Sequence, residues 1–156
     1  MKTLKIIRYR LGVSRKFPTT HKRKGEETEF EVKILMGLQG FNNSKIHTIR
    51  SNYDLWSKRM EKVHAGLAVI ELFYWEGKPY NSKQVVFATL DKDYGCGVQK
   101  ADFDDYLYSL KVDDKRIELG NIPANDGLSH SDFEEWFKKY DLSKPMAIVH
   151  FTSYRY

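Results

Sequence analysis

The chain has 156 residues, of which 41% are hydrophobic and 30% charged, and this size and composition predict one domain with its own core. Cys96 is the only cysteine, which excludes an internal disulfide and a cysteine-based zinc site. No apolar run is long enough for a signal peptide or a membrane span. We therefore expect a single cytoplasmic domain over residues 1–156 that does not associate with membranes.

Positive charge is concentrated at the N-terminus. Residues 1–24 hold nine basic side chains and no acidic one, whereas the remaining residues carry 17 basic and 21 acidic side chains. This asymmetry is typical of a surface that contacts phosphates, and it predicts a nucleic-acid arm at Lys22, Arg23 and Lys24. The alternative is a solvated loop, because basic stretches attract any polyanion without sequence information.

Apolar periodicity gives the predicted elements in chain order. Alternating or β-branched residues predict strands at residues 4–11, 45–50, 67–75, 84–90, 94–98, 106–112, 115–119 and 146–151. Apolar residues at helical spacing predict helices at residues 28–40, 51–66 and 131–140. Short strands with about three scattered helices lack the alternation of a doubly wound sheet, so we predict an α+β fold with a mixed, curled sheet.

The predicted helices have recognisable start signals. Thr28 and Glu31 form a capping-box pattern, and Ser51 precedes the second helix with an acidic residue in its first turn. For the third helix, either Ser129 or Ser131 is placed to act as the cap.

Most familiar catalytic motifs are absent. The sequence contains no phosphate-binding GxxxxGK, no dinucleotide-binding glycine pattern, no HExxH and no GxSxG. The five histidines show no familiar metal-ligand spacing. We therefore expect neither a metal ion nor a cofactor.

Two short clusters are more informative, namely the sequence KIHTIR at residues 45–50 and NDGLS at residues 125–129. On an ideal strand Thr48 and Arg50 share one face, and Lys45 joins them only if it precedes the strand or if the strand is bulged. If the two clusters have no functional role, the first is an exposed strand of mixed charge and the second is a turn before a helix.

The two clusters, in this order around an amphipathic helix and a final strand, resemble the ASCH domains of the PUA-like superfamily. The pattern is most similar to small bacterial N(4)-acetylcytidine amidohydrolases and to uncharacterised phage-borne and bacterial relatives. The resemblance covers residues 28–50 and 122–152. It implies a single PUA-like domain, a curled mixed β-barrel whose pocket binds RNA or a modified nucleoside.

The resemblance also implies a catalytic set. In the amidohydrolases a Lys, a Thr and a Glu are the proposed catalytic groups, and they correspond here to Lys45, Thr48 and Asp126, whose side chain is one methylene shorter than Glu. In such a pocket a desolvated Lys45 would activate Thr48 or a water, while Asp126 would orient or deprotonate the water. Arg50 would hold a phosphate or an oxyanion.

Further residues are expected at the ligand. We assign ligand contacts to His47 and Asn125 within the two clusters, and to Tyr80 and Lys83 after a turn at residues 76–79, where aromatic rings would stack on a base. The alternative for the aromatic residues is ordinary packing.

Two classes of function follow. The first is a pocket for RNA or a modified nucleoside, which either only recognises its ligand or also hydrolyses an N-acyl pyrimidine nucleoside; the sequence favours recognition. The second is a non-catalytic protein-interaction domain of phage or mobile-element origin, since a fold resemblance alone does not establish function. The sequence does not define the oligomeric state.

Overall fold

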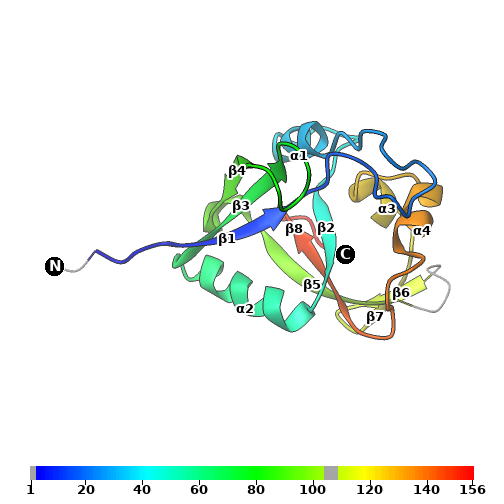
Figure 1. The fold of residues 1–156 in the computed structure, drawn as a ribbon. Helices are drawn as coiled ribbons and strands as arrows, with labels where there is room; N and C mark the ends of the chain where they lie inside the picture. The colour runs from blue at the N-terminus through cyan, green and yellow to red at the C-terminus, as the bar shows by residue number, and fades with distance from the viewer. Residues whose placement is uncertain (1–2, 104–108) are drawn as a thin grey trace.

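The structure is a computed structural model that describes residues 3–103 and 109–156 (Figure 1). The α-helices are α1 (Phe30–Leu38), α2 (Tyr53–His64), α3 (Ile122–Asn125) and α4 (His130–Phe137), with a short 3-10 helix, η1 (Lys92–Tyr94). The strands are β1 (Ile7–Gly12), β2 (His47–Ser51), β3 (Ala68–Trp75), β4 (Gln84–Leu90), β5 (Gly97–Phe103), β6 (Ser109–Val112), β7 (Lys115–Glu118) and β8 (Met146–His150). The predicted α+β class is confirmed.

The described strands form two sheets. One sheet has the order β1-β3-β4, with β1 parallel to β3 and β4 antiparallel to it. The other has the order β2-β8-β5-β6-β7 and is antiparallel throughout. Over residues 3–103 and 109–156 the two sheets do not close into a barrel.

Helix α2 joins the two sheets, because it contacts β3 of the smaller sheet as well as β5 and β8 of the larger one. Its apolar face explains this position, since Trp56, Met60 and Val63 recur at helical spacing and all three are buried. Strand β8 is an inner strand of the larger sheet, between β2 and β5, and all five of its residues are buried. The core contains the buried face of α2 and of the two sheets, and it extends to Phe30 and Ile34 of α1 and to Phe133 and Phe137 of α4.

Several boundaries differ from the prediction. The strand predicted at 94–98 is wrong in its first half, because Gly95 has a φ of +76° and β5 begins only at Gly97. The four described α-helices exceed the expected three, because the turn predicted at Asn125 is the end of the one-turn helix α3. The first part of the strand predicted at 106–112 falls outside the described residues.

The helix caps are also shifted. The N-cap of α1 is Glu29 rather than Thr28, although the Thr28 hydroxyl accepts the amide hydrogen of Phe30 at 3.3 Å and donates to the carbonyl of Ser14 at 2.6 Å. The N-cap of α2 is Asn52 rather than Ser51. For α4 the cap is Ser129, one of the two predicted choices, and its hydroxyl accepts the amide hydrogen of Asp132 at 3.1 Å.

In the described part of the chain, no helix combines the length and the apolar character that crossing a bilayer requires.

Candidate functional site

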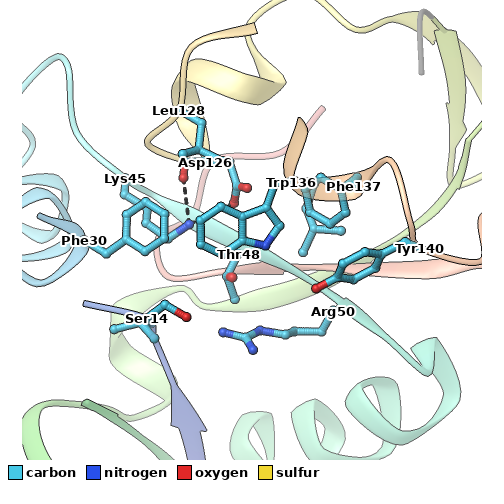
Figure 2. A pocket seen from close by; sticks show the side chains of 12 residues that line it. Ser14, Phe30, Lys45, Thr48, Arg50, Asp126, Leu128, Trp136, Phe137 and Tyr140 are labelled. Carbon is cyan, nitrogen blue, oxygen red and sulfur yellow. Dashed lines mark hydrogen bonds and ion pairs between the residues drawn. The ribbon is translucent and has the colours of Figure 1, made fainter. Parts of the chain in front are cut away.

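The two sequence clusters meet at one pocket with a volume of about 90 Å³. Four of its lining residues are the predicted polar ones, Lys45, Thr48, Arg50 and Asp126. Trp136 and Phe137 of α4, and Tyr140 three residues beyond the helix, supply aromatic walls, and Phe30 of α1 closes the Lys45 end (Figure 2). The pocket therefore has a polar floor from β2, the residue Lys45 before it and Asp126 at the end of α3, and an aromatic side from α1 and the α4 region.

Lys45 reaches the floor because it lies before β2 rather than in it. Its amide donates to the carbonyl of Lys33 in α1 at 3.1 Å, and it forms an isolated antiparallel bridge with Asp126. The next amide, that of Ile46, donates to the carbonyl of Asn125 at 2.9 Å. Strand alternation begins only at His47, so the first of the two conditions for joining Lys45 with Thr48 is met.

Two glycines allow this close approach. A Cβ atom on Gly37 of α1 would lie 2.8 Å from the carbonyl oxygen of Lys45, which is shorter than real contacts. Gly127 has a φ of +80°, and a Cβ atom there would lie 3.2 Å from the Cβ of Lys45. Both positions therefore need a residue without a side chain.

Lys45 and Asp126 form a buried ion pair. The ammonium Nζ donates to Asp126 Oδ1 at 3.0 Å and to the carbonyl of Asp126 at 2.7 Å, and it lies 4.3 Å from the centre of the Phe30 ring. Lys45 is only 2% exposed and Asp126 3%. A pair this deep is stable only when its remaining hydrogen-bonding capacity is also used.

The charges of the pair are set by burial and by each other. Burial by itself raises the pKa of Asp126, but the Lys45 ammonium and the hydrogen bond from His47 outweigh it and hold that pKa below its ordinary value. Burial lowers the pKa of Lys45, and the attraction of Asp126 opposes this shift without cancelling it. Asp126 is therefore an ionised acceptor, and Lys45 is a stronger acid than a lysine in water.

Thr48 and one oxygen of Asp126 are two polar groups of the pocket that remain free for a ligand. Within the described residues, neither the Thr48 hydroxyl nor Asp126 Oδ2 has a hydrogen-bond partner, and both residues line the pocket. The two groups offer a donor and an acceptor to a bound molecule or water.

Arg50 forms the opposite pole of the pocket. Its Nη2 donates to the carbonyl of Gly12 in β1, which ties the larger sheet to the smaller one. Its Nε is buried and has no partner among the described residues. Burial lowers the pKa of Arg50, but a guanidinium keeps its charge in proteins. In Figure 2 the hydroxyl of Tyr140 points toward this guanidinium.

His47 and Asn125 lie behind Asp126 rather than in the pocket. His47 Nδ1 is 3.3 Å from Asp126 Oδ1, and its Nε2 is 2.6 Å from the hydroxyl of Tyr156. Asn125 Nδ2 donates to the same hydroxyl at 2.9 Å. Burial lowers the pKa of His47, so its imidazole is neutral.

The other predicted ligand contacts are separate from the pocket. Tyr80 and Lys83 lie in the exposed β3–β4 connection, and neither lines the pocket. Tyr80 is 87% exposed and its ring centre lies 5.3 Å from that of Trp75.

The basic stretch of the N-terminal segment packs against α4. Lys22 donates to the hydroxyl of Ser131, and Arg23 Nη1 lies 2.5 Å from the carboxylate of Asp132. Lys24 is exposed. The charge of Arg23 is thus matched within the protein, whereas Lys24 faces solvent.

Sequence reasoning missed the aromatic walls and Tyr156. Trp136 and Phe137 were assigned to a helix stripe, which they do form, but Trp136 also faces the pocket. Tyr156 has no local signal at all, because its partners lie 109 and 31 residues away.

The described residues contain no group of three or more His, Cys, Asp or Glu side chains arranged to hold a metal ion. No protein-family model, no curated protein and no solved structure matches this chain.

Proposed function

We propose that the chain binds an N-acylated pyrimidine nucleoside, free or within RNA, and hydrolyses its exocyclic amide in the cytoplasm. One observation carries the proposal. Lys45, Thr48 and Asp126, the three residues that correspond to the catalytic set of the ASCH amidohydrolases, line a single pocket although Asp126 is 81 residues from Lys45. Such convergence is what a catalytic site requires and what a solvated strand and a turn would not produce.

The same proposal extends to the fold. We infer that the two sheets correspond to the curled barrel of PUA-like domains. Two contacts support this, since α2 packs on both sheets and Arg50 of β2 donates to Gly12 of β1.

The chemistry follows from the charges. Asp126 Oδ2 takes a proton from a water, and the water oxygen attacks the acyl carbon while the carbonyl electron pair moves onto oxygen. The Thr48 hydroxyl and the Lys45 ammonium donate to this oxyanion. The carbon–nitrogen bond then breaks and the leaving nitrogen takes the proton from Asp126, so that one water and one amide give a carboxylic acid and a free amine.

The size of the pocket defines how a nucleoside would bind. A volume of about 90 Å³ is well below the roughly 300–1,000 Å³ of pockets that enclose a whole ligand. The acyl group and the adjoining edge of the base would enter, with Trp136 and Phe137 beside them, and the sugar would remain at the mouth. This arrangement accommodates a free nucleoside and also a nucleotide within a flexible RNA strand.

The direct test is deacetylation of N(4)-acetylcytidine followed by chromatography. We expect turnover by the wild-type protein and a fall in kcat of about 100-fold or more for Thr48→Val, because the variant removes one hydrogen-bond donor to the oxyanion. Thr89→Val is the matched control, since Thr89 is an exposed residue of β4 that takes the same change. Equal turnover by the Thr48 and Thr89 variants, or no turnover by the wild type, would refute the proposed hydrolysis.

A non-catalytic RNA-binding domain is the second candidate, and one observation favours it. Arg8 and Arg10 share the single carboxylate of Glu71 at 3.0 and 2.8 Å, and their side chains are 62% and 44% exposed. Two guanidinium groups on one carboxylate leave positive charge for a phosphate. This candidate predicts RNA affinity that falls steeply with salt concentration, without turnover of the acetylated base.

A further inference from the structure

A chain of hydrogen bonds runs from the interior to the base of the pocket. Asn125 Nδ2 lies 2.9 Å from the Tyr156 hydroxyl, which lies 2.6 Å from His47 Nε2. On the other side of the imidazole ring, Nδ1 lies 3.3 Å from Asp126 Oδ1, and Lys45 Nζ lies 3.0 Å from the same oxygen.

The groups at the two ends of this chain of hydrogen bonds determine which atom donates and which accepts at each step. Asp126 is ionised and only accepts, so Nδ1 of His47 carries a hydrogen. The buried imidazole is neutral, so Nε2 is bare and accepts the hydrogen of the Tyr156 hydroxyl. The lone pairs of that hydroxyl are then free for the Asn125 amide, which only donates through its nitrogen. Each donor finds an acceptor.

Tyr156 is held in this place by its backbone as well. Its amide donates to Gln99 Oε1 at 2.9 Å, and its carbonyl accepts from Gln99 Nε2 at 3.2 Å. Gln99 is in turn fixed by His150 at 3.0 Å and by Asp113 at 3.1 Å. This degree of orientation exceeds what packing of an aromatic ring needs, and it aims the hydroxyl at one nitrogen of His47.

We propose that His47 and Tyr156 are positioning residues for Asp126. The chain holds His47 as the Nδ1–H tautomer, which together with Lys45 saturates Oδ1 and leaves Oδ2 alone to face the pocket. Asp126 would then meet a water or a ligand with one defined oxygen. This inference rests on the proposed amide hydrolysis and extends it, because it names His47 and Tyr156 as the residues that orient the general base Asp126.

The charged and titratable groups around the chain come from every neighbouring element. Lys45 and Arg50 lie on the β2 side, Lys33 lies on α1, and His150 lies on β8 with its ring centre 5.5 Å from that of His47. Tyr154 and Arg155 belong to the segment that carries Tyr156. Of these groups only Lys45 bonds to Asp126. The hydrogen-bonded route from Tyr156 to the Asp126 carboxylate runs through His47, in addition to a direct electrostatic influence between Tyr156 and Asp126.

The first experiment measures the tautomer and needs no substrate. Nitrogen-15 NMR of the imidazoles at neutral pH should show a protonated Nδ1 and a bare Nε2 for His47. In Tyr156→Phe the Nε2 resonance should move downfield because its donor is lost, while Tyr154→Phe, the same change two residues away, should leave it unchanged. A wild-type His47 that carries its hydrogen on Nε2, or on both nitrogens, would overturn the proposal.

The second experiment follows Asp126 itself. Carbon-13 titration of its carboxyl should give a higher pKa in Tyr156→Phe than in the wild type or Tyr154→Phe, because a loosely held His47 donates less well and that bond lowers the pKa of Asp126. With N(4)-acetylcytidine, kcat of Tyr156→Phe should fall about 10-fold at constant KM, and the acidic limb of its pH profile should move to higher pH.

The two proposals fail separately. An inactive wild type would refute the amide hydrolysis, and the tautomer and the carboxyl titration would still decide the positioning role. Identical Asp126 titrations in the Tyr156 and Tyr154 variants would refute the positioning role even if the enzyme turns over.

Discussion

Replacing Lys45 with methionine separates the charge of the buried pair from its volume. Methionine keeps most of the unbranched stem of lysine, so packing against Phe30 changes little. The change leaves the carboxylate of Asp126, 3% exposed, without its ammonium. We expect Lys45→Met to be strongly destabilised because an uncompensated charge remains in the interior.

The loss of unfolding free energy in Lys45→Met can be estimated from the burial of the ion pair. Removing one partner of a buried, hydrogen-bonded pair costs about 3–5 kcal/mol. Domains are stable by about 5–15 kcal/mol, so the variant stays folded unless the wild type lies near the bottom of this range. For a chain of this size each kcal/mol shifts Tm by roughly 2–4 °C, which gives a fall of roughly 6–20 °C.

The stability of Lys45→Met should change with pH in the direction expected for a buried carboxylate that has lost its partner. In Lys45→Met, burial still raises the pKa of Asp126 while the largest opposing influence is gone, so that pKa lies above its unfolded value of about 3.9. The folded state then binds more protons than the unfolded state between the two values, and stability falls as pH rises through the folded pKa. The variant should therefore be more stable at pH 5 than at pH 7.

Urea denaturation followed by circular dichroism at both pH values provides the assay. The double variant Lys45→Met/Asp126→Asn should regain stability at pH 7, because it removes the stranded charge and keeps an acceptor for His47. Lys138→Met, which breaks an exposed pair with Glu135, should change little. A loss below about 1 kcal/mol, or one that is equal at pH 5 and pH 7, would refute the reasoning about a buried unpaired charge.

Two further predictions concern α4 and the core. Ser129→Ala removes the hydroxyl that accepts the Asp132 amide hydrogen, and should cost about 1 kcal/mol in chemical denaturation while loosening Trp136 of the same helix, which is readable in its fluorescence. Burial lowers the pKa of His150 to about 3 from its ordinary 6.5, so the unfolded state binds an extra proton between these values. Wild-type stability should therefore fall from pH 6.5 toward pH 4, and the fall should be smaller in His150→Gln.

Local sequence patterns predicted many of the helices and strands. Strand β4 is confirmed at both ends, Gln84 and Leu90, because β-branched and apolar residues lie between clear turn signals. The helix starts were one residue early at Thr28 and Ser51, because Glu29 and Asn52 adopt left-handed backbone angles that composition does not reveal. Pairing partners were beyond reach, since a strand pattern does not specify which strand lies beside it.

In the site as well, some residues could be predicted from local sequence and others depend on long-range contacts. Strand alternation predicts that Thr48 and Arg50 share one face. It places Lys45 with them only if Lys45 precedes the strand, and the bridge between Lys45 and Asp126 before β2 meets this condition. Tyr156 could not have been found, because its role depends on a contact across the whole chain with His47. The resemblance together with strand alternation thus predicted the polar residues that line the pocket, whereas the residues that contact Asp126 from behind depend on long-range topology.

The parallel pairing of β1 with β3 has a consequence for synthesis of the chain. Ile7 lies beside Ala68, so the N-terminal strand waits for about sixty further residues before its partner exists. During that interval an apolar strand with free backbone groups is a template for aggregation. Arg8 and Arg10 interrupt its hydrophobic residues with charge, and both later pair with Glu71 of β3. Charges within a β-prone segment disfavour aggregation, and in β1 the same two side chains become partners of Glu71 once the sheet has formed.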